Sequence, residues 1–148
     1  MRVQDVIKTK GHDVIKVVET IKVAQAVRVM QERAIGALVV VAPGGELKGV
    51  ISEREIVAAL ARHGKAALQL RASEVMLADC PVVTPMDSVH DAMAIMTAQR
   101  VRHLPVMMNA SVIGLISIGD TVKARLSEKI AENLVLRDIA RWPNASVA

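Results

Sequence analysis

Two segments of the chain place a serine three residues before a carboxylate, Ser52-x-x-Glu55 and Ser117-x-x-Asp120. At the start of a helix this spacing caps free amides, because the serine hydroxyl accepts from the first turn and an acid suits the helix dipole. Glu55 can also reach back to the amide of Ser52, which would complete a capping box. The same geometry can bind a ligand: free amides favour a phosphate, and the carboxylate can accept both hydroxyls of a ribose. The two roles are compatible, and the spacing leaves both open.

The other reactive side chains do not form a catalytic or metal-binding pattern. Cys80 is the single cysteine, which excludes a disulfide within the chain. His12, His63 and His90 lack the spacing of metal ligands relative to one another and to Cys80. The sequence shows neither a set of nucleophile, base and orienting residue nor a P-loop. We therefore predict a non-catalytic protein without a bound metal.

Both serine motifs belong to an internal repeat. Three segments of the first half return in the same order in the second: 3–7 as 72–76, 23–30 as 89–96, and 49–55 as 114–120. Chance does not produce this many ordered matches, so the chain is a tandem duplication. We predict a first repeat at residues 1–70 and a second repeat, with a C-terminal helical extension, at residues 71–148.

Each repeat has the residue pattern of a strand, a helix, two strands and a second helix. Apolar residues of the helices recur at the i, i+3 and i+4 spacing, and turn residues separate the strands. The predicted strands are 14–18, 38–41, 48–52, 81–84, 104–108 and 112–117, and the second helices begin at Ser52 and Ser117. The pattern predicts an α+β fold. Because one unit of about 65 residues has a marginal core, we expect the two to pack across their sheets.

The composition limits the class of protein. Of 148 residues 52% are hydrophobic and 1% aromatic, with Trp142 as the single aromatic residue, so the core must be aliphatic and the chain ordered. The longest uncharged apolar stretch, 34–45, is too short to span a membrane, and the N-terminus lacks a signal-peptide pattern. We therefore expect a cytoplasmic protein that does not contact a membrane.

The net charge of +4 suits an anionic ligand or nucleic acid. The basic residues are scattered, and the chain lacks the aromatic side chains on which single-stranded nucleic acid stacks. An anionic small ligand is favoured on these grounds, and a basic surface for nucleic acid is the alternative.

Three segments resemble the tandem cystathionine-β-synthase (CBS) domain family: Gly49-Val-Ile-Ser-Glu-Arg-Glu55, Val101-Arg-His-Leu-Pro-Val106 and Gly114-Leu-Ile-Ser-Ile-Gly-Asp120. The resemblance covers nearly the whole chain. Lys10-Gly11 before the first strand and the long C-terminal helix also resemble small bacterial proteins that consist of a CBS pair and little else. The family resemblance implies a Bateman module, in which a pseudo-two-fold axis relates two clefts. Such modules commonly bind AMP, ADP, ATP, NAD or S-adenosylmethionine and usually form dimers. The resemblance thus implies a ligand-sensing regulatory module, and a structural module without a ligand is the alternative.

The resemblance also implies which residues line each cleft, because each cleft combines a helix start of one repeat with a strand edge of the other. The first cleft would contain Lys10, Ile15, Ile35, Gly36, Ala37, Ser117, Gly119 and Asp120. The second cleft would contain Ser52, Arg54, Glu55, Pro81, Val82, Val101, Arg102 and His103.

The resemblance assigns roles to several of these side chains. Asp120 would hold a ribose, and Ser117 with Lys10 would face a phosphate. Arg102 and His103 match positions of phosphate-binding basic side chains, a role that suits arginine in particular. Taken without the motif, His103 is typical of a histidine at a strand end with a local hydrogen bond.

The two clefts cannot be chemically equivalent, because Gly36-Ala37 stands where the second repeat has Arg102-His103. Glu55 replaces the aspartate that the family prefers, so we assign ribose binding to Asp120 and treat the other cleft as a second or weaker site. An adenine base would lie between aliphatic side chains such as Ile15, Ile35, Val82 and Val101. A homodimer is expected from the family and from the apolar stripe of the last helix, Val122, Leu126, Ile130 and Leu134.

Overall fold

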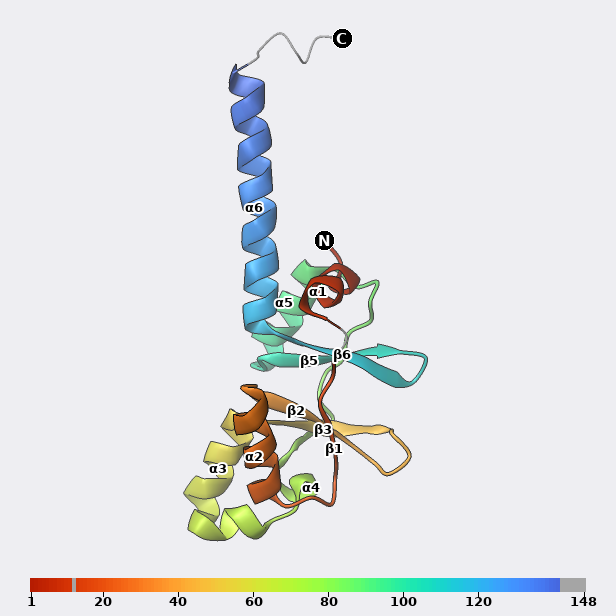
Figure 1. Cartoon of the computed structure of the whole chain (residues 1–148), viewed down its shortest axis with the longest axis vertical. Helices are drawn as coiled ribbons and strands as arrows, with labels where there is room; N and C mark the ends of the chain where they lie inside the picture. The colour runs from red at the N-terminus through yellow and green to blue at the C-terminus, as the bar shows by residue number, and fades with distance from the viewer. Residues whose placement is uncertain (12, 142–148) are drawn as a thin grey trace.

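Helices and strands follow the duplicated pattern in the computed structural model, which describes residues 1–11 and 13–141 (Figure 1). The elements up to residue 69 are α1 (Val3–Lys10), β1 (Lys16–Val18), α2 (Val23–Arg33), β2 (Ala37–Val41), β3 (Leu47–Ser52), α3 (Glu53–His63) and the 3₁₀ helix η1 (Gly64–Gln69). The elements after it are α4 (Ala72–Val75), β4 (Leu77–Ala78), α5 (Val89–Gln99), β5 (His103–Met108), β6 (Ser111–Ser117) and α6 (Ile118–Arg141). His12 and Trp142, and the end of the predicted second repeat, lie outside the described residues.

The strands form two sheets in the described part of the chain. β1 pairs parallel with β2, whereas β2 with β3 and β3 with β4 pair antiparallel. β5 and β6 form an antiparallel pair. The predicted strand 81–84 is reduced to one parallel bridge between Val83 and Val106. Pro81 and Pro85 on either side lack the N–H groups that would extend the pairing.

Helix α1 packs into the core of the second repeat, although it lies at the start of the first. Val3, Val6 and Ile7 are buried together with Leu104 of β5 and Ile116 of β6. Its first turn is also attached to the loop before α5 by backbone hydrogen bonds. The second repeat therefore receives part of its core from the first ten residues.

Helix α4 makes the reciprocal contact. Ala72 is fully buried in the core of the first repeat, and β4 extends the sheet of that repeat along β3. Each exchanged segment contacts a strand of the other repeat at a glycine: β4 at Gly49 of β3, and α1 at Gly114 of β6. The two glycines occupy equivalent positions in the two repeats. A Cβ atom on Gly49 would collide with the carbonyl oxygen of Leu77, and one on Gly114 would lie 2.9 Å from Cδ1 of Ile7. The two repeats thus complete each other.

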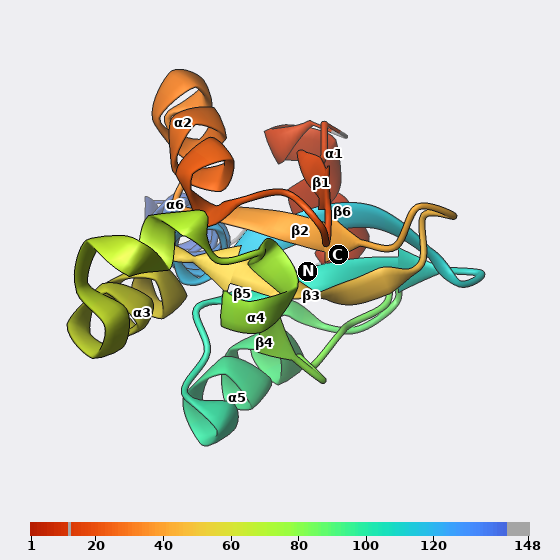
Figure 2. The same cartoon turned by 90° about the horizontal axis from the view of Figure 1, so that it is seen from below.

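The repeats also pack sheet against sheet. Val39 and Val41 of β2 and Val112 of β6 form a buried cluster between the two sheets. In Figure 1, β2 and β3 face β5 and β6 across this layer, and Figure 2 shows the sheets stacked at the centre with the helices around them. The predicted α+β fold, with its two repeats packed across their sheets, is confirmed.

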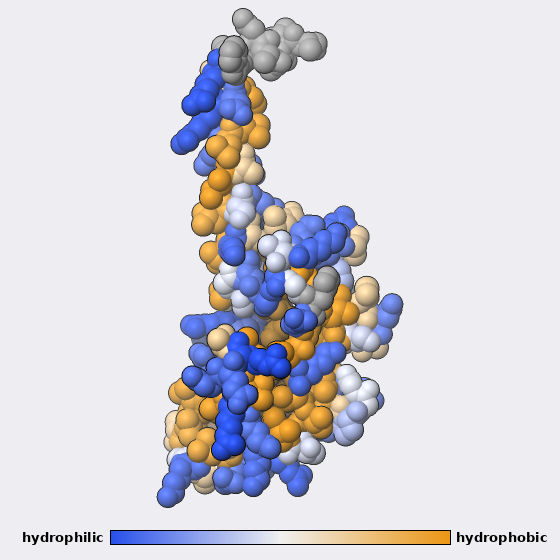
Figure 3. Space-filling view, viewed as in Figure 1, coloured by the Kyte–Doolittle hydropathy of each residue, from blue (hydrophilic) through white to orange (hydrophobic). Residues whose placement is uncertain are grey.

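Helix α6 extends away from both repeats, as Figure 1 shows. It has 24 residues, of which only Thr121 is buried. The helix runs through the four residues of the predicted apolar stripe and ends at Arg141. Figure 3 shows apolar surface along its length. The exposed large apolar residues of this helix from residue 122 onward are Val122, Leu126, Ile130, Leu134, Val135, Leu136 and Ile139. In the described residues no helix combines the length and the apolar character needed to cross a membrane.

Candidate functional site

Ser117 and Asp120 cap the start of α6 with a reciprocal pair of hydrogen bonds. The amide of Ser117 donates to Asp120 Oδ2 at 2.8 Å, and the amide of Asp120 donates to Ser117 Oγ at 3.1 Å. The capping role predicted from the Ser-x-x-Asp spacing is confirmed here. Capping uses only one carboxylate oxygen, since Asp120 Oδ1 accepts no hydrogen bond from the described residues.

Lys10 joins this capping pair from α1. Its Nζ donates to Asp120 Oδ2 and to the carbonyl oxygen of Leu115, each at 2.7 Å. Burial acts against the charged carboxylate, but the hydrogen bonds from Lys10 and Ser117 outweigh it and hold the pKa of Asp120 below its ordinary value. The exchange of α1 thus brings together Lys10, Ser117 and Asp120, three residues predicted to share the first cleft.

The predicted capping box of Ser52 and Glu55 is wrong. Ser52 is the N-cap residue of α3, but its side chain makes no capping hydrogen bond. Instead its hydroxyl donates to Glu55 Oε2 at 2.8 Å. The extra methylene lets the carboxylate reach the hydroxyl, so each group satisfies the other and neither caps an amide. The start of α3 therefore keeps first-turn amides that no side chain of the described residues caps, and such amides favour an anion.

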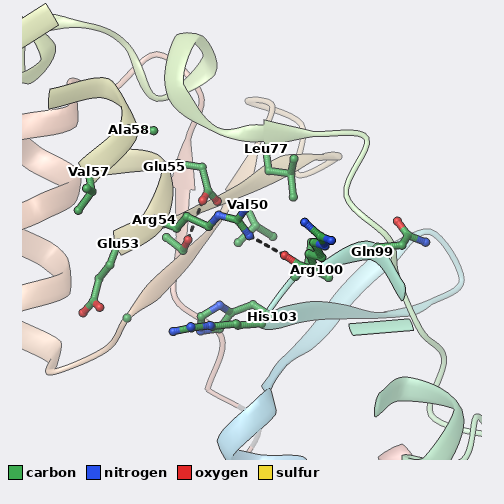
Figure 4. A pocket seen from close by; sticks show the side chains of 14 residues that line it. Val50, Glu53, Arg54, Glu55, Val57, Ala58, Leu77, Gln99, Arg100 and His103 are labelled. Atoms are coloured by element: carbon green, nitrogen blue, oxygen red, sulfur yellow. Dashed lines mark hydrogen bonds between the residues drawn. The ribbon is translucent and has the colours of Figure 1, made fainter. Parts of the chain in front are cut away.

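A cavity of about 770 Å³ opens at the start of α3, and we call it the α3 pocket (Figure 4). It brings together six residues predicted for the second cleft: Ser52, Arg54, Glu55, Val101, Arg102 and His103. Gly36, predicted for the first cleft, also lines it. Pro81 and Val82 are not among its lining residues, and the aliphatic side chains present are Val50, Val57, Ala58, Leu77 and Val101.

The remaining residues predicted for the first cleft lie on several elements. Ile15 and Ile35 pack against the core of the first repeat, and Ala37 is buried at the start of β2. Ile35 also lines a groove between α2 and α3. Gly119 is exposed in the first turn of α6.

Arg54 crosses the α3 pocket and connects the two repeats. Its Nη1 donates to the carbonyl oxygen of Arg100 at 2.6 Å, a contact drawn as a dashed line in Figure 4. Arg100 ends α5 in the left-handed conformation, with φ 55°, and its repeat equivalent Ala34 does the same, with φ 53°. Sequence reasoning missed Arg100 and Glu53 as pocket residues. The shared helix end at Ala34 and Arg100 is the signal that could have identified Arg100.

Three arginines line the α3 pocket, Arg54, Arg100 and Arg102. In the described part of the chain none of them forms an ion pair with a carboxylate, although Glu53 and Glu55 line the same pocket. Unpaired cations at the wall of a cavity create a positive potential that attracts anions. The described residues contain no group of three or more His, Cys, Asp or Glu side chains that could hold a metal ion.

His103 adds a titratable group to this pocket. Burial, followed by the positive charge of Lys10, lowers the pKa of its imidazole. In the β5–β6 pairing it stands opposite Ser117, the N-cap of α6. The histidine therefore lies between the α3 pocket and the Lys10–Asp120 pair.

Comparison with known proteins agrees with the duplicated architecture. The family model for the CBS domain matches twice, at residues 3–62 and 72–127. The chain is 37% identical over 110 residues to the mitochondrial CBS domain-containing protein CBSX3 of Arabidopsis thaliana, which covers 72% of this chain and 53% of that protein. It therefore spans about half the length of that relative.

Solved structures give the same result. The crystal structure of a CBS-domain containing protein from Agrobacterium tumefaciens has a TM-score of 0.81 and 37% identity, over 84% of this chain and 92% of that one. The CBS domain pair of protein MJ0100, in complex with 5′-methylthioadenosine and S-adenosyl-L-methionine, has a TM-score of 0.75 and 20% identity over 86% of this chain and 98% of that one. With both repeats matched by the family model and the fold shared with solved CBS pairs, the chain belongs to the CBS-domain family.

Proposed function

We propose that the protein is a non-catalytic regulatory module that binds an adenosine-containing ligand, AMP, ADP, ATP or NAD, between its two repeats. The observation that carries this proposal is the α3 pocket, which is lined by three arginines and by a helix start whose N-cap side chain makes no capping bond. Among the described residues none of these arginines forms an ion pair with a carboxylate. Phosphate groups satisfy both features at once, because guanidinium groups and helix N-termini are the usual phosphate ligands in proteins. The adenosine-containing ligands of the MJ0100 pair, which shares the fold, support the same class of ligand.

The pocket also has walls that suit a base. Val50, Val57, Leu77 and Val101 line it, and the chain has no Phe or Tyr that could stack on an adenine ring. Aliphatic walls stabilise a flat ring by burial alone, and they discriminate poorly between one base and another. Selectivity would therefore come from the groups that contact phosphate and sugar.

The second proposed contact is a ribose on Asp120. Its Oδ1 atom is free to accept a hydroxyl while Oδ2 keeps the bonds from Lys10 and Ser117. The carboxylate stays ionised at neutral pH, which is the form that accepts both hydroxyls. The two clefts would then differ in chemistry, one rich in arginine and one with a lysine–aspartate pair.

Calorimetric titration with AMP, ATP, NAD and S-adenosylmethionine tests this function. We expect at least one of these ligands to bind, and at 100 times its Kd to stabilise the fold by about 2.7 kcal/mol. Arg102→Gln should weaken binding of a phosphate-bearing ligand about tenfold or more, because a charge-assisted contact is lost. Asp120→Asn should weaken binding if the ribose lies on Asp120.

The matched control is Arg62→Gln, which removes the same charge from an exposed position of α3 outside the pocket. Its affinity should equal that of the wild type. If none of the four ligands binds the wild type, the proposed function is wrong. Normal binding by Asp120→Asn would refute the ribose assignment alone.

The proposed module is a homodimer that uses α6. Seven large apolar side chains of this helix are between 49% and 61% exposed. Burial of such a surface against a partner lowers the free energy of the helix in water. A second copy of the chain offers the same surface. In a regulatory module, this contact would let ligand binding alter the relation between two protomers.

A further inference from the structure

His103 stands where the two candidate ligand sites meet. It lines the α3 pocket together with Arg54 and Arg100, and Figure 4 shows it entering from β5, below these two residues in that view. On its other side the β5–β6 ladder places it opposite Ser117, which binds Asp120. The side chain is half-buried, so its charge is only partly screened by water.

Charged groups act on the imidazole from every element around it. Lys10 lies on α1, Glu53 on α3 and Asp120 on α6, and Arg102 immediately precedes His103. Burial and then Lys10 lower the pKa of the histidine, Arg102 adds to this effect, and Asp120 and Glu53 oppose it. The imidazole of the free protein is therefore neutral at pH 7.

An anion in the α3 pocket shifts the balance of charges around His103 towards protonation. A phosphate placed beside the ring adds negative charge to a half-buried site, and negative charge favours the imidazolium form. The imidazolium also gains a second N–H group that can donate to a phosphate oxygen. We propose that His103 takes up a proton when an anionic ligand binds in the α3 pocket, so that the protein binds this ligand more tightly as the pH falls. The inference rests on the proposed function, because it concerns the same pocket.

The direction of the pH dependence follows from the number of protons bound by the complex and by the free protein. The complex holds more protons than the free protein, so the association constant rises as the pH falls, until the free imidazole is itself protonated. Between about pH 7.5 and pH 6.5 we expect the affinity to rise about three- to tenfold, where tenfold corresponds to uptake of one whole proton. Below the pKa of the free histidine the affinity should stop changing.

Calorimetric titration of the full chain with ATP, without a divalent cation, counts the protons when it is repeated in two buffers of different ionisation enthalpy. The quantity of interest is the proton uptake of the wild type minus that of His103→Gln, because protons taken up by ATP itself cancel in this difference. We expect a positive difference at pH 7. His90→Gln, on an exposed position of α5, should behave as the wild type.

Equal proton uptake by the wild type and His103→Gln, with both binding ATP, would overturn this proposal and leave the proposed function standing. Failure of ATP to bind the wild type would overturn the ATP site and this inference together. If His103→Gln does not bind or fold, the ring nitrogen resonances of the wild type decide. A shift of His103 to the imidazolium form on addition of ATP at pH 7 supports the proposal, and unchanged resonances refute it.

Discussion

Single hydrogen bonds decide what each serine motif does. At Ser117 the shorter aspartate reaches the backbone amide, so the motif caps α6 and still leaves one carboxylate oxygen free. At Ser52 the longer glutamate reaches the hydroxyl, and the cap is lost. The one methylene group by which Glu55 exceeds Asp120 thus accompanies a large difference. Helix α6 is capped and keeps a carboxylate oxygen as acceptor, whereas α3 lacks a side-chain cap and begins in the arginine-rich α3 pocket.

The Lys10–Asp120 ion pair predicts a pH-dependent stability. The pKa of Asp120 is lowered in the folded chain, so the pair stabilises the fold above the ordinary aspartate pKa and loses this effect as the pH falls through the folded value. We expect Lys10→Met to reduce the free energy of unfolding by about 0.5 to 1 kcal/mol at pH 7, since the pair is partly exposed. The difference should shrink as the pH falls below the ordinary aspartate pKa, and it should vanish once Asp120 is protonated in the folded chain.

Urea unfolding of both proteins at neutral and at acidic pH measures this difference. Lys8→Met is the matched control, because Lys8 is exposed on the same helix and forms no ion pair among the described residues. An equal loss of stability by Lys10→Met at both pH values would contradict the assignment to the ion pair.

At the scale of elements, the two equivalent glycines predict different costs for the same substitution. A Cβ atom at Gly49 meets the backbone carbonyl of Leu77, so β4 must move away from β3. A Cβ atom at Gly114 meets the end of the Ile7 side chain, which can rotate. We expect Gly49→Ala to lower the free energy of unfolding by about 2 to 3 kcal/mol and Gly114→Ala by about 1 kcal/mol or less.

Denaturant titration of the two variants tests this order. Each variant serves as the control for the other, because both replace a strand glycine of the same repeat position by alanine. If the two variants lose equal stability, or Gly114→Ala loses more, then the contacts of the exchanged segments do not determine how much each substitution destabilises the fold.

Most elements were predictable because their apolar periodicity is local. The strands of both hairpins, the start of the second helices and the continuation of α6 through Leu134 all follow from residues close in sequence. The exchange of α1 and α4 was not predictable in this way. The segments 3–7 and 72–76 match in sequence, but only the complete fold decides which core each one enters.

The candidate site was predictable to a similar degree. The family resemblance named Lys10 and Asp120, which the structure joins, and Arg54, Arg102 and His103, which line the α3 pocket. Arg100 was not foreseen, because its contact with Arg54 uses a backbone oxygen that a left-handed helix end presents. A sequence motif records side chains, and it does not show where a backbone carbonyl points.

At the scale of the whole molecule, the apolar stripe of α6 predicts the oligomeric state. We expect light scattering at micromolar concentration to give twice the mass of one chain. The double variant Leu126→Glu, Ile130→Glu should be monomeric, because two charges cannot be buried in an apolar contact without partners.

Glu132→Lys is the control, since Glu132 is exposed on the same helix and lies about 120° or more around its axis from Leu126, Ile130 and Leu134 by the helical period. This variant should remain a dimer. A monomeric wild type would exclude the homodimer, and a dimeric double variant would place the interface elsewhere.

The exchange of α1 and α4 also sets an order for folding during synthesis. The first repeat has all its strands once β4 has been made, so it can fold early. Helix α1 is made before the other described elements, but its contacts lie with Leu104 and Ile116, about a hundred residues further on. Contacts so distant in sequence form late, because the intervening chain must first be made and ordered. Helix α1 therefore reaches its place only after the second repeat has been made, and Lys10 meets Asp120 once β5, β6 and the start of α6 are present.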